Sequence, residues 1–134
     1  MARLMCFRDA VRREPAIDAW FDRRGALGEL VRPWFERMRA CGADVRELLH
    51  DDQPTACVGD AAFAYVNTFT AHANVGFFVG PELPDPAGLL QGTGAFMRHV
   101  KLRPGRPVDP ALGALIEQAY VIIGEEAAAR REGR

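Results

Sequence analysis

An alternation of apolar with small or polar side chains over residues 61–79 constrains the fold more than any other feature of this 134-residue chain. The period of two is typical of β-strands with one buried face. It is interrupted near Ala71 and His72 and resumes directly afterwards. On the first of the two predicted strands, Phe63 and Tyr65 are expected to share a face. Two strands joined by so short a connection predict an antiparallel hairpin.

The rest of the chain contains helical patterns before and after this hairpin and shorter strands beside it. The predicted elements are helices over 16–23 and 27–41, strands over 45–50, 57–58 and 96–102, a helical turn over 85–90, and a final helix from Asp109. Pro33 lies inside the second helical pattern, so that helix is expected to begin near Arg32 or to kink there. Residues 1–15 are expected to be weakly ordered, and residues 16–134 to form one domain. This order of elements indicates an α+β fold, in which an antiparallel sheet of about four to five strands packs against N-terminal and C-terminal helices.

Composition and charge restrict the classes of function. The chain is 49% hydrophobic and 26% charged, with a net charge of −1, as expected for a globular protein with one core. A near-neutral chain has no general attraction for nucleic acid or for an anionic membrane surface, and no apolar run approaches the roughly 20 residues of a membrane span. The three cysteines are too widely spaced for a paired redox or zinc motif. We therefore expect a cytoplasmic protein without nucleic-acid or membrane partners.

A first group of candidate residues lies at the hairpin and on the strand that follows it. His99 and Lys101 are two apart on one predicted strand and point to the same face, as do His72 and Asn74. If that strand pairs with the hairpin, the four side chains converge near Tyr65. Imidazole beside an amine suits a small anionic ligand such as a carboxylate or a phosphate. The alternative is a solvated sheet face on which Lys101 extends into water.

A second group is acidic and lies at and around the strand predicted over 45–50. Its members are Asp44, Glu47, His50, Asp51 and Asp52. Carboxylates with an imidazole are suitable ligands for iron(II) or a similar divalent ion. The alternative is ordinary turn composition, because Asp stabilises turns through local hydrogen bonds to the backbone. The spacing contains no tight metal-binding motif.

Four segments, taken in order, resemble the YdhG-like family of small bacterial proteins. They are residues 73–78 (ANVGFF), 82–90 (ELPDPAGLL), 92–94 (GTG) and 97–102 (MRHVKL), and the resemblance covers roughly residues 27–123. It implies a compact α+β domain with a curved antiparallel sheet, similar in outline to frataxin. Most of the family has no assigned activity, and one branch is described as a frataxin-like iron chaperone. The resemblance supplies no catalytic residues.

These features favour a non-enzymatic binding or interaction protein with an unidentified small ligand. A frataxin-like iron-binding chaperone is the alternative, with iron bound by the acidic group. A small hydrolase or transferase is the third hypothesis, although no nucleophile, base and orienting residue form a recognisable trio. A homodimer is compatible with aromatic side chains exposed on a short sheet. The anion hypothesis requires His72 and His99 to lie on neighbouring antiparallel segments.

Overall fold

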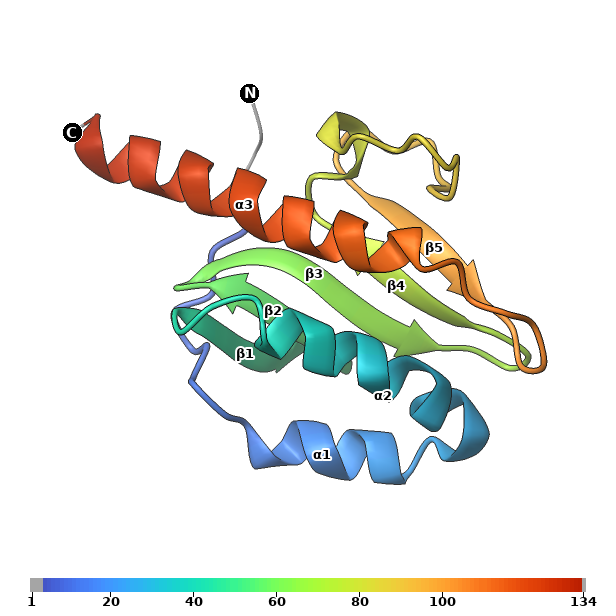
Figure 1. The fold of residues 1–134 in the computed structure, drawn as a ribbon. Coiled ribbons are helices and arrows are strands. Elements are labelled where there is room, and N and C mark those ends of the chain that lie inside the picture. The colour runs from blue at the N-terminus through green and yellow to red at the C-terminus, as the bar shows by residue number, and fades with distance from the viewer. Residues whose placement is uncertain (1–3, 134) are drawn as a thin grey trace.

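The computed structural model describes residues 4–133; Met1 to Arg3 and Arg134 lie outside this range. Its elements are, in chain order, α1 (Pro15–Asp22), α2 (Gly25–Arg39), β1 (Val45–His50), β2 (Gln53–Val58), β3 (Ala61–Thr68), β4 (Ala73–Phe77), the 3₁₀ turn η1 (Gly80–Glu82), β5 (Arg98–Leu102) and α3 (Ala111–Glu132). The strands form one antiparallel sheet in the order β1-β2-β3-β4-β5, so each strand pairs with its neighbour in sequence (Figure 1). The predicted α+β fold is confirmed.

The three helices cover one face of this sheet (Figure 1). Helix α2 packs across β1 to β4, α3 packs on β2 and β3, and α1 lies against α2 and β1. The main core fills the space between helices and sheet, and its largest buried side chains include Trp20, Phe21, Phe35, Phe63 and Phe77. Burying a side chain such as Phe contributes about 1.5–3 kcal/mol. None of the helices described has the length and apolarity needed to cross a membrane. The opposite face of the sheet, which these helices leave uncovered, is called the open face below.

A β-bulge in β3 changes the facing predicted for its aromatic residues. Ala56 and Cys57 are adjacent on β2, whereas their partners on β3, Ala64 and Ala62, are separated by Phe63. Phe63 is therefore the extra residue. A bulge shifts the alternation by one position. Phe63 therefore faces the helices, where its ring packs edge-to-face on Tyr120 with centroids 5.6 Å apart, while Tyr65 belongs to a smaller apolar cluster on the open face. The prediction that Phe63 and Tyr65 share a face is wrong.

Helix α2 passes through its proline. It begins before Pro33 and continues to Arg39, so the alternative in which it starts near Arg32 is wrong. An interior proline removes a hydrogen bond and costs about 3 kcal/mol. Burial of Val31 and Phe35, on either side of the proline, opposes this cost.

The helical turn expected over residues 85–90 is also wrong, because this segment is a loop without helical structure. Asp85 does provide the expected side-chain acceptor. Its two carboxylate oxygens accept the backbone N–H groups of Leu89 and Leu90, each at 2.9 Å. The carboxylate thus fixes a loop beside β5 instead of beginning a helix.

The N-terminal segment runs across the sheet before α1 begins. The amide of Phe7 donates to the carbonyl of Asp60 at 2.7 Å, and Val11 pairs with Glu47 on the outer edge of β1 through bonds of 2.7 and 2.9 Å. The side chains of Phe7 and Ala10 pack on the open face. Residues 5–11 are called the strap below; the sequence suggested weak order here, but the structure gives the segment backbone partners at both ends.

Tyr65 and Gly76 form a close cross-strand pair on the open face. They are direct partners in the β3–β4 register, and the phenol ring lies over the glycine. A Cβ atom at position 76 would lie 2.0 Å from ring atoms of Tyr65. The orientation of the ring therefore depends on the absence of a side chain at this position.

We predict that Gly76→Ala destabilises the protein by about 1–3 kcal/mol, because the added methyl group must displace a half-buried ring. Urea unfolding followed by circular dichroism measures the change. Gly94→Ala is the matched control, since a Cβ atom there meets nothing closer than 3.9 Å. Equal unfolding midpoints for the two variants would contradict the proposed packing of Tyr65 on Gly76.

Candidate functional site

The strand register brings four of the five candidate ligand-binding residues onto the open face: Tyr65, Asn74, His99 and Lys101. Tyr65 pairs with Gly76, Gly76 pairs with His99, and Asn74 pairs with Lys101. Directly paired residues project from the same face of a sheet. The Oδ1 atom of Asn74 is buried and has no hydrogen-bond partner among the described residues, so it requires a donor from solvent or a ligand.

His72 lies in the turn between β3 and β4, where its ring stacks on Phe69 with centroids 4.8 Å apart. Burial lowers the pKa of His72, and Lys101, Arg103 and His99 lower it further. Burial and Lys101 likewise lower the pKa of His99. His72 thus lies in the turn directly before β4 and His99 on the neighbouring β5, and Lys101 lowers the pKa of both.

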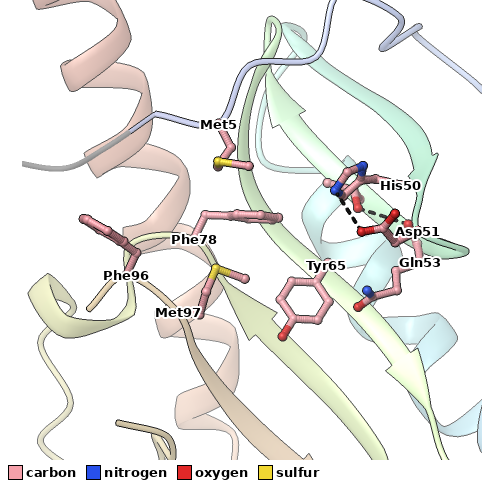
Figure 2. A pocket seen from close by; sticks show the side chains of 9 residues that line it. Met5, His50, Asp51, Gln53, Tyr65, Phe78, Phe96 and Met97 are labelled. Carbon is pink, nitrogen blue, oxygen red and sulfur yellow. Dashed lines mark hydrogen bonds and ion pairs between the residues drawn. The ribbon is translucent and has the colours of Figure 1, made fainter. Parts of the chain in front are cut away.

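The open face also contains a hollow of about 310 Å³ that the sequence did not predict (Figure 2). Its apolar wall consists of Met5 from the strap, Phe78 after β4, and Phe96 and Met97 from the loop before β5. Three of these side chains are exposed: Met5 by 40%, Phe96 by 41% and Met97 by 39%. Tyr65 contributes from β3, and its ring packs edge-to-face on Phe78 with centroids 5.6 Å apart.

The other wall of the hollow is polar and comes from β1, β2 and the turn between them (Figure 2). His50 Nε2 lies 3.4 Å from a carboxylate oxygen of Asp51, and Gln53 and Thr55 follow on β2. Asp51 and Asp52 have left-handed φ angles of 50° and 58°, which give the tight turn its direction. Among the described residues, the lining includes one carboxylate and no lysine or arginine.

Tyr65 contributes its phenol to this hollow in the protonated form. Burial raises the pKa of Tyr65, so the hydroxyl stays neutral at physiological pH. A neutral phenol both donates and accepts hydrogen bonds. The hollow therefore combines apolar contact area with a few polar groups that can orient a ligand.

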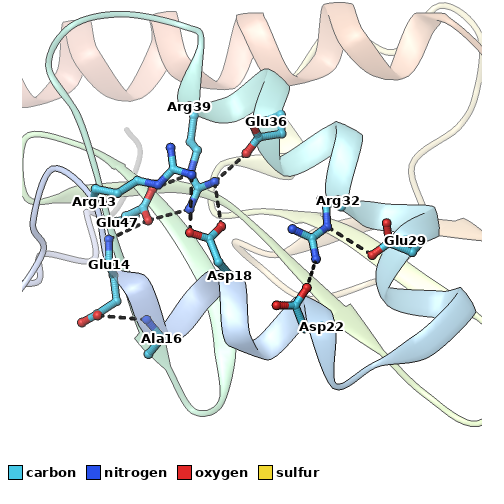
Figure 3. Close-up of polar contacts among 10 residues, drawn as sticks. All are labelled: Arg13, Glu14, Ala16, Asp18, Asp22, Glu29, Arg32, Glu36, Arg39 and Glu47. Atoms are coloured by element: carbon cyan, nitrogen blue, oxygen red, sulfur yellow. Dashed lines mark hydrogen bonds and ion pairs between the residues drawn. The ribbon is translucent and has the colours of Figure 1, made fainter.

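The structure does not bring the five predicted metal ligands together. Glu47 is 1% exposed and faces the helices, where Arg39 donates to both of its carboxylate oxygens at 2.7 and 2.8 Å (Figure 3). Asp44 accepts the hydroxyl of Tyr120 at 2.6 Å, and this bond raises the pKa of Tyr120 to about 12. Both carboxylates are thus engaged by side chains from the helices.

The remaining predicted metal ligands are divided between two sides of the β1–β2 turn. Asp52 pairs with Arg24 at 2.5 Å, which leaves His50 and Asp51 as neighbours at the hollow. Nowhere in residues 4–133 do three or more His, Cys, Asp or Glu side chains form a group that could hold a metal ion. The acidic group therefore serves the packing of the fold and the polar wall of the hollow.

Comparison with protein-family models, with curated proteins and with solved structures found no match to this chain. The YdhG-like resemblance, the cytoplasmic location and the homodimer remain predictions. The function has to be argued from the geometry of the chain itself.

The residues of the hollow that the sequence analysis missed are the apolar side chains of its loops and strap, together with Gln53 and Thr55 on β2. Phe96 and Met97 were assigned to a strand, and Met5 to a weakly ordered segment. One local signal was present: Gly76 lies inside a strand, and a glycine there often marks close approach of another group. Which group approaches follows only from the register with Tyr65.

Cysteine reactivity tests whether the strap covers the sheet. Cys57 is buried beneath Phe7 and Ala10, and burial raises its pKa to about 12. Because thiolates are the reactive form, we predict that iodoacetamide at pH 8 modifies the exposed Cys6 first and Cys57 last, as followed by peptide mass spectrometry. The half-buried Cys41, whose pKa burial raises to about 11, is the internal reference. Modification of Cys57 as fast as Cys6 in the folded protein would mean that the strap leaves it accessible.

The buried ion pair predicts a large effect on stability. We expect Glu47→Ala to lower the free energy of unfolding by about 3–5 kcal/mol, because it leaves the largely buried Arg39 guanidinium without its main partner. Glu117→Ala removes an exposed partner of Arg37 and should cost less than about 1 kcal/mol. Urea unfolding of both variants measures the difference, and similar losses would show that Glu47 is no more important than a surface carboxylate.

Proposed function

We propose that this chain is a non-enzymatic binding protein that holds a small, largely apolar organic molecule in the hollow of the open face. The gathering of Met5, Phe96 and Met97 around one opening supports this most directly. Isolated exposed apolar side chains are ordinary, whereas a concentration of them marks a binding site. The volume of about 310 Å³ lies at the lower end of the roughly 300–1,000 Å³ typical of small-molecule sites.

The two walls of the hollow indicate the chemistry of the ligand. Aromatic rings pack favourably on aromatic and thioether side chains, and Tyr65, Phe78 and Met97 provide both. The opposite wall presents the carboxylate of Asp51 and the imidazole of His50. This wall complements a hydrogen-bond donor or a cation and repels an anion. An aromatic compound carrying an amine or N–H group meets both requirements.

The arrangement of the polar wall favours binding over catalysis. The hydroxyl of Thr55 donates to the backbone carbonyl of Gln53 at 3.0 Å, and Thr55 is itself buried. A His–Asp pair activates a nucleophile only when that nucleophile lies within hydrogen-bond reach of the imidazole. The aliphatic hydroxyl in this lining is engaged elsewhere, and burial raises the pKa of the Tyr65 phenol, which makes it a weaker nucleophile at neutral pH. Both observations support a non-enzymatic role. The iron-binding alternative has no corresponding cluster in the part of the chain described.

Three indole compounds that differ in charge test this function. We predict that tryptamine and neutral indole bind, and that tryptamine binds at least about tenfold more tightly than indole-3-acetate, because the acetate faces Asp51. Isothermal calorimetry measures the three dissociation constants. No binding of any of the three at millimolar concentration would refute the proposed ligand class, and preferential binding of the acetate would refute the charge argument.

Variants locate the bound ring. Met97→Ala removes apolar contact area from the hollow and should weaken indole binding by roughly tenfold, which corresponds to about 1.4 kcal/mol. Val121→Ala removes a comparably exposed apolar side chain, 44% exposed, from α3 and should leave binding unchanged. Equal effects of the two substitutions would place the ring outside the hollow.

A further inference from the structure

A second hollow, at the outer edge of β5, carries the opposite charge. It has a volume of about 360 Å³ and lies between the loop before β5 and residues 103–109, which lead to α3. Lys101, Arg103 and Arg106 line it. It shares no lining residue with the hollow of the open face, so the two are separate features of the molecule. It is called the basic groove below.

The cations of the basic groove have no carboxylate partner within ion-pair distance in the described part of the chain. Within residues 4–133, Lys101, Arg103 and Arg106 form no ion pair. The one carboxylate in the lining belongs to Asp109. Its Oδ1 atom accepts the amide of Ala111 at 2.9 Å, at the start of α3. Three unpaired cations therefore face a single carboxylate that already has a partner, in a chain whose net charge is −1.

The histidines beside the basic groove experience this positive charge. Burial, Lys101 and Arg103 lower the pKa of His72, and burial and Lys101 lower that of His99. A cation disfavours protonation of a neighbouring imidazole. The effect reaches both histidines and shows that the positive charge extends over the end of the sheet next to the groove.

The backbone of β5 adds a hydrogen-bond donor to the basic groove. His99 lies opposite Gly76 of β4, but its N–H and C=O groups point away from β4 and exchange bonds of 2.7 and 3.0 Å with Gln91. Alternation along an antiparallel strand directs the same groups of Lys101 outward as well. The loop that covers the edge at His99 provides no such pairing for Lys101 among the described residues. An outward N–H group without a backbone partner, beside guanidinium groups, is a typical element of an anion site.

We propose that the basic groove binds the phosphate group of a small organic molecule. Two guanidinium groups, an ammonium group and an outward N–H supply the donors that phosphate oxygens require. Three cations match a phosphate dianion better than a carboxylate, which carries a single charge. The proposal concerns a different place and a different ligand chemistry from the hollow of the open face, and it does not depend on the function proposed for that hollow.

Inorganic phosphate at constant ionic strength is the first probe. Calorimetry should show saturable binding, and replacing both Arg103 and Arg106 by alanine should weaken it by at least about tenfold. Arg46→Ala is the matched control, because Arg46 is an exposed arginine on β1 without an ion pair in the described chain. Equal affinity of the double variant and the wild type would overturn the proposal. Binding that does not saturate at phosphate concentrations up to about 10 mM would also overturn it.

Nuclear magnetic resonance of the imidazole protons gives the location independently of affinity. Bound phosphate should raise the pKa of His72 towards its ordinary value, because the anion offsets Lys101 and Arg103. An unchanged His72 titration at saturating phosphate would show that phosphate binds elsewhere. Saturating indole should leave the phosphate affinity unchanged. Phosphate binding without indole binding would therefore support the phosphate site in the basic groove and refute only the function proposed for the open face.

Discussion

The extra residue of β3 determines which side chains the sheet presents to its helices and which to its open face. Without the bulge at Phe63, strict alternation would place Phe63 and Tyr65 on the same side. The bulge instead directs Phe63 onto Tyr120 in the core and Tyr65 into the hollow. A large aromatic ring is thus available to each layer from positions only two apart, and the open face acquires the residue around which its site is built.

A sheet with helices on one face must also protect the apolar residues of the other face. Here the strap covers part of that face, and Phe7 and Ala10 bury Cys57. The cover is incomplete: a hollow remains between Met5, the loop before β5 and the turn between β1 and β2. The site therefore results from the incomplete cover of the open face. Strands form its floor and irregular segments form its rim, an arrangement common at binding sites.

Periodicity predicted the hairpin, the later strand and the final helix, because in these segments local sequence and burial agree. Periodicity failed where the structure depends on a single inserted residue or on a partner that is distant in the sequence. An alternating pattern carries no sign of a bulge, and the strand predicted over 57–58 begins earlier, at Gln53, as β2. The shared face of Asn74, His99 and Lys101 follows from alternation and register. The acidic group shows the opposite case: Glu47 and Asp44 are engaged by Arg39 and Tyr120, and no spacing along the chain reveals those partners.

The two hollows differ in the charged side chains that line them, and they share no lining residue among those described. The polar wall beside β1 presents one carboxylate and no lysine or arginine, whereas the edge at β5 presents three cations without ion pairs among the described residues. Tyr65, Gly76 and His99 form a row across the strands from the first region towards the second. Since Tyr65 is held protonated by burial, no charge of its own links the two regions. Lys101, Arg103 and Arg106 thus gather at the outer edge of β5, whereas the hollow of the open face is lined mainly by apolar and aromatic side chains.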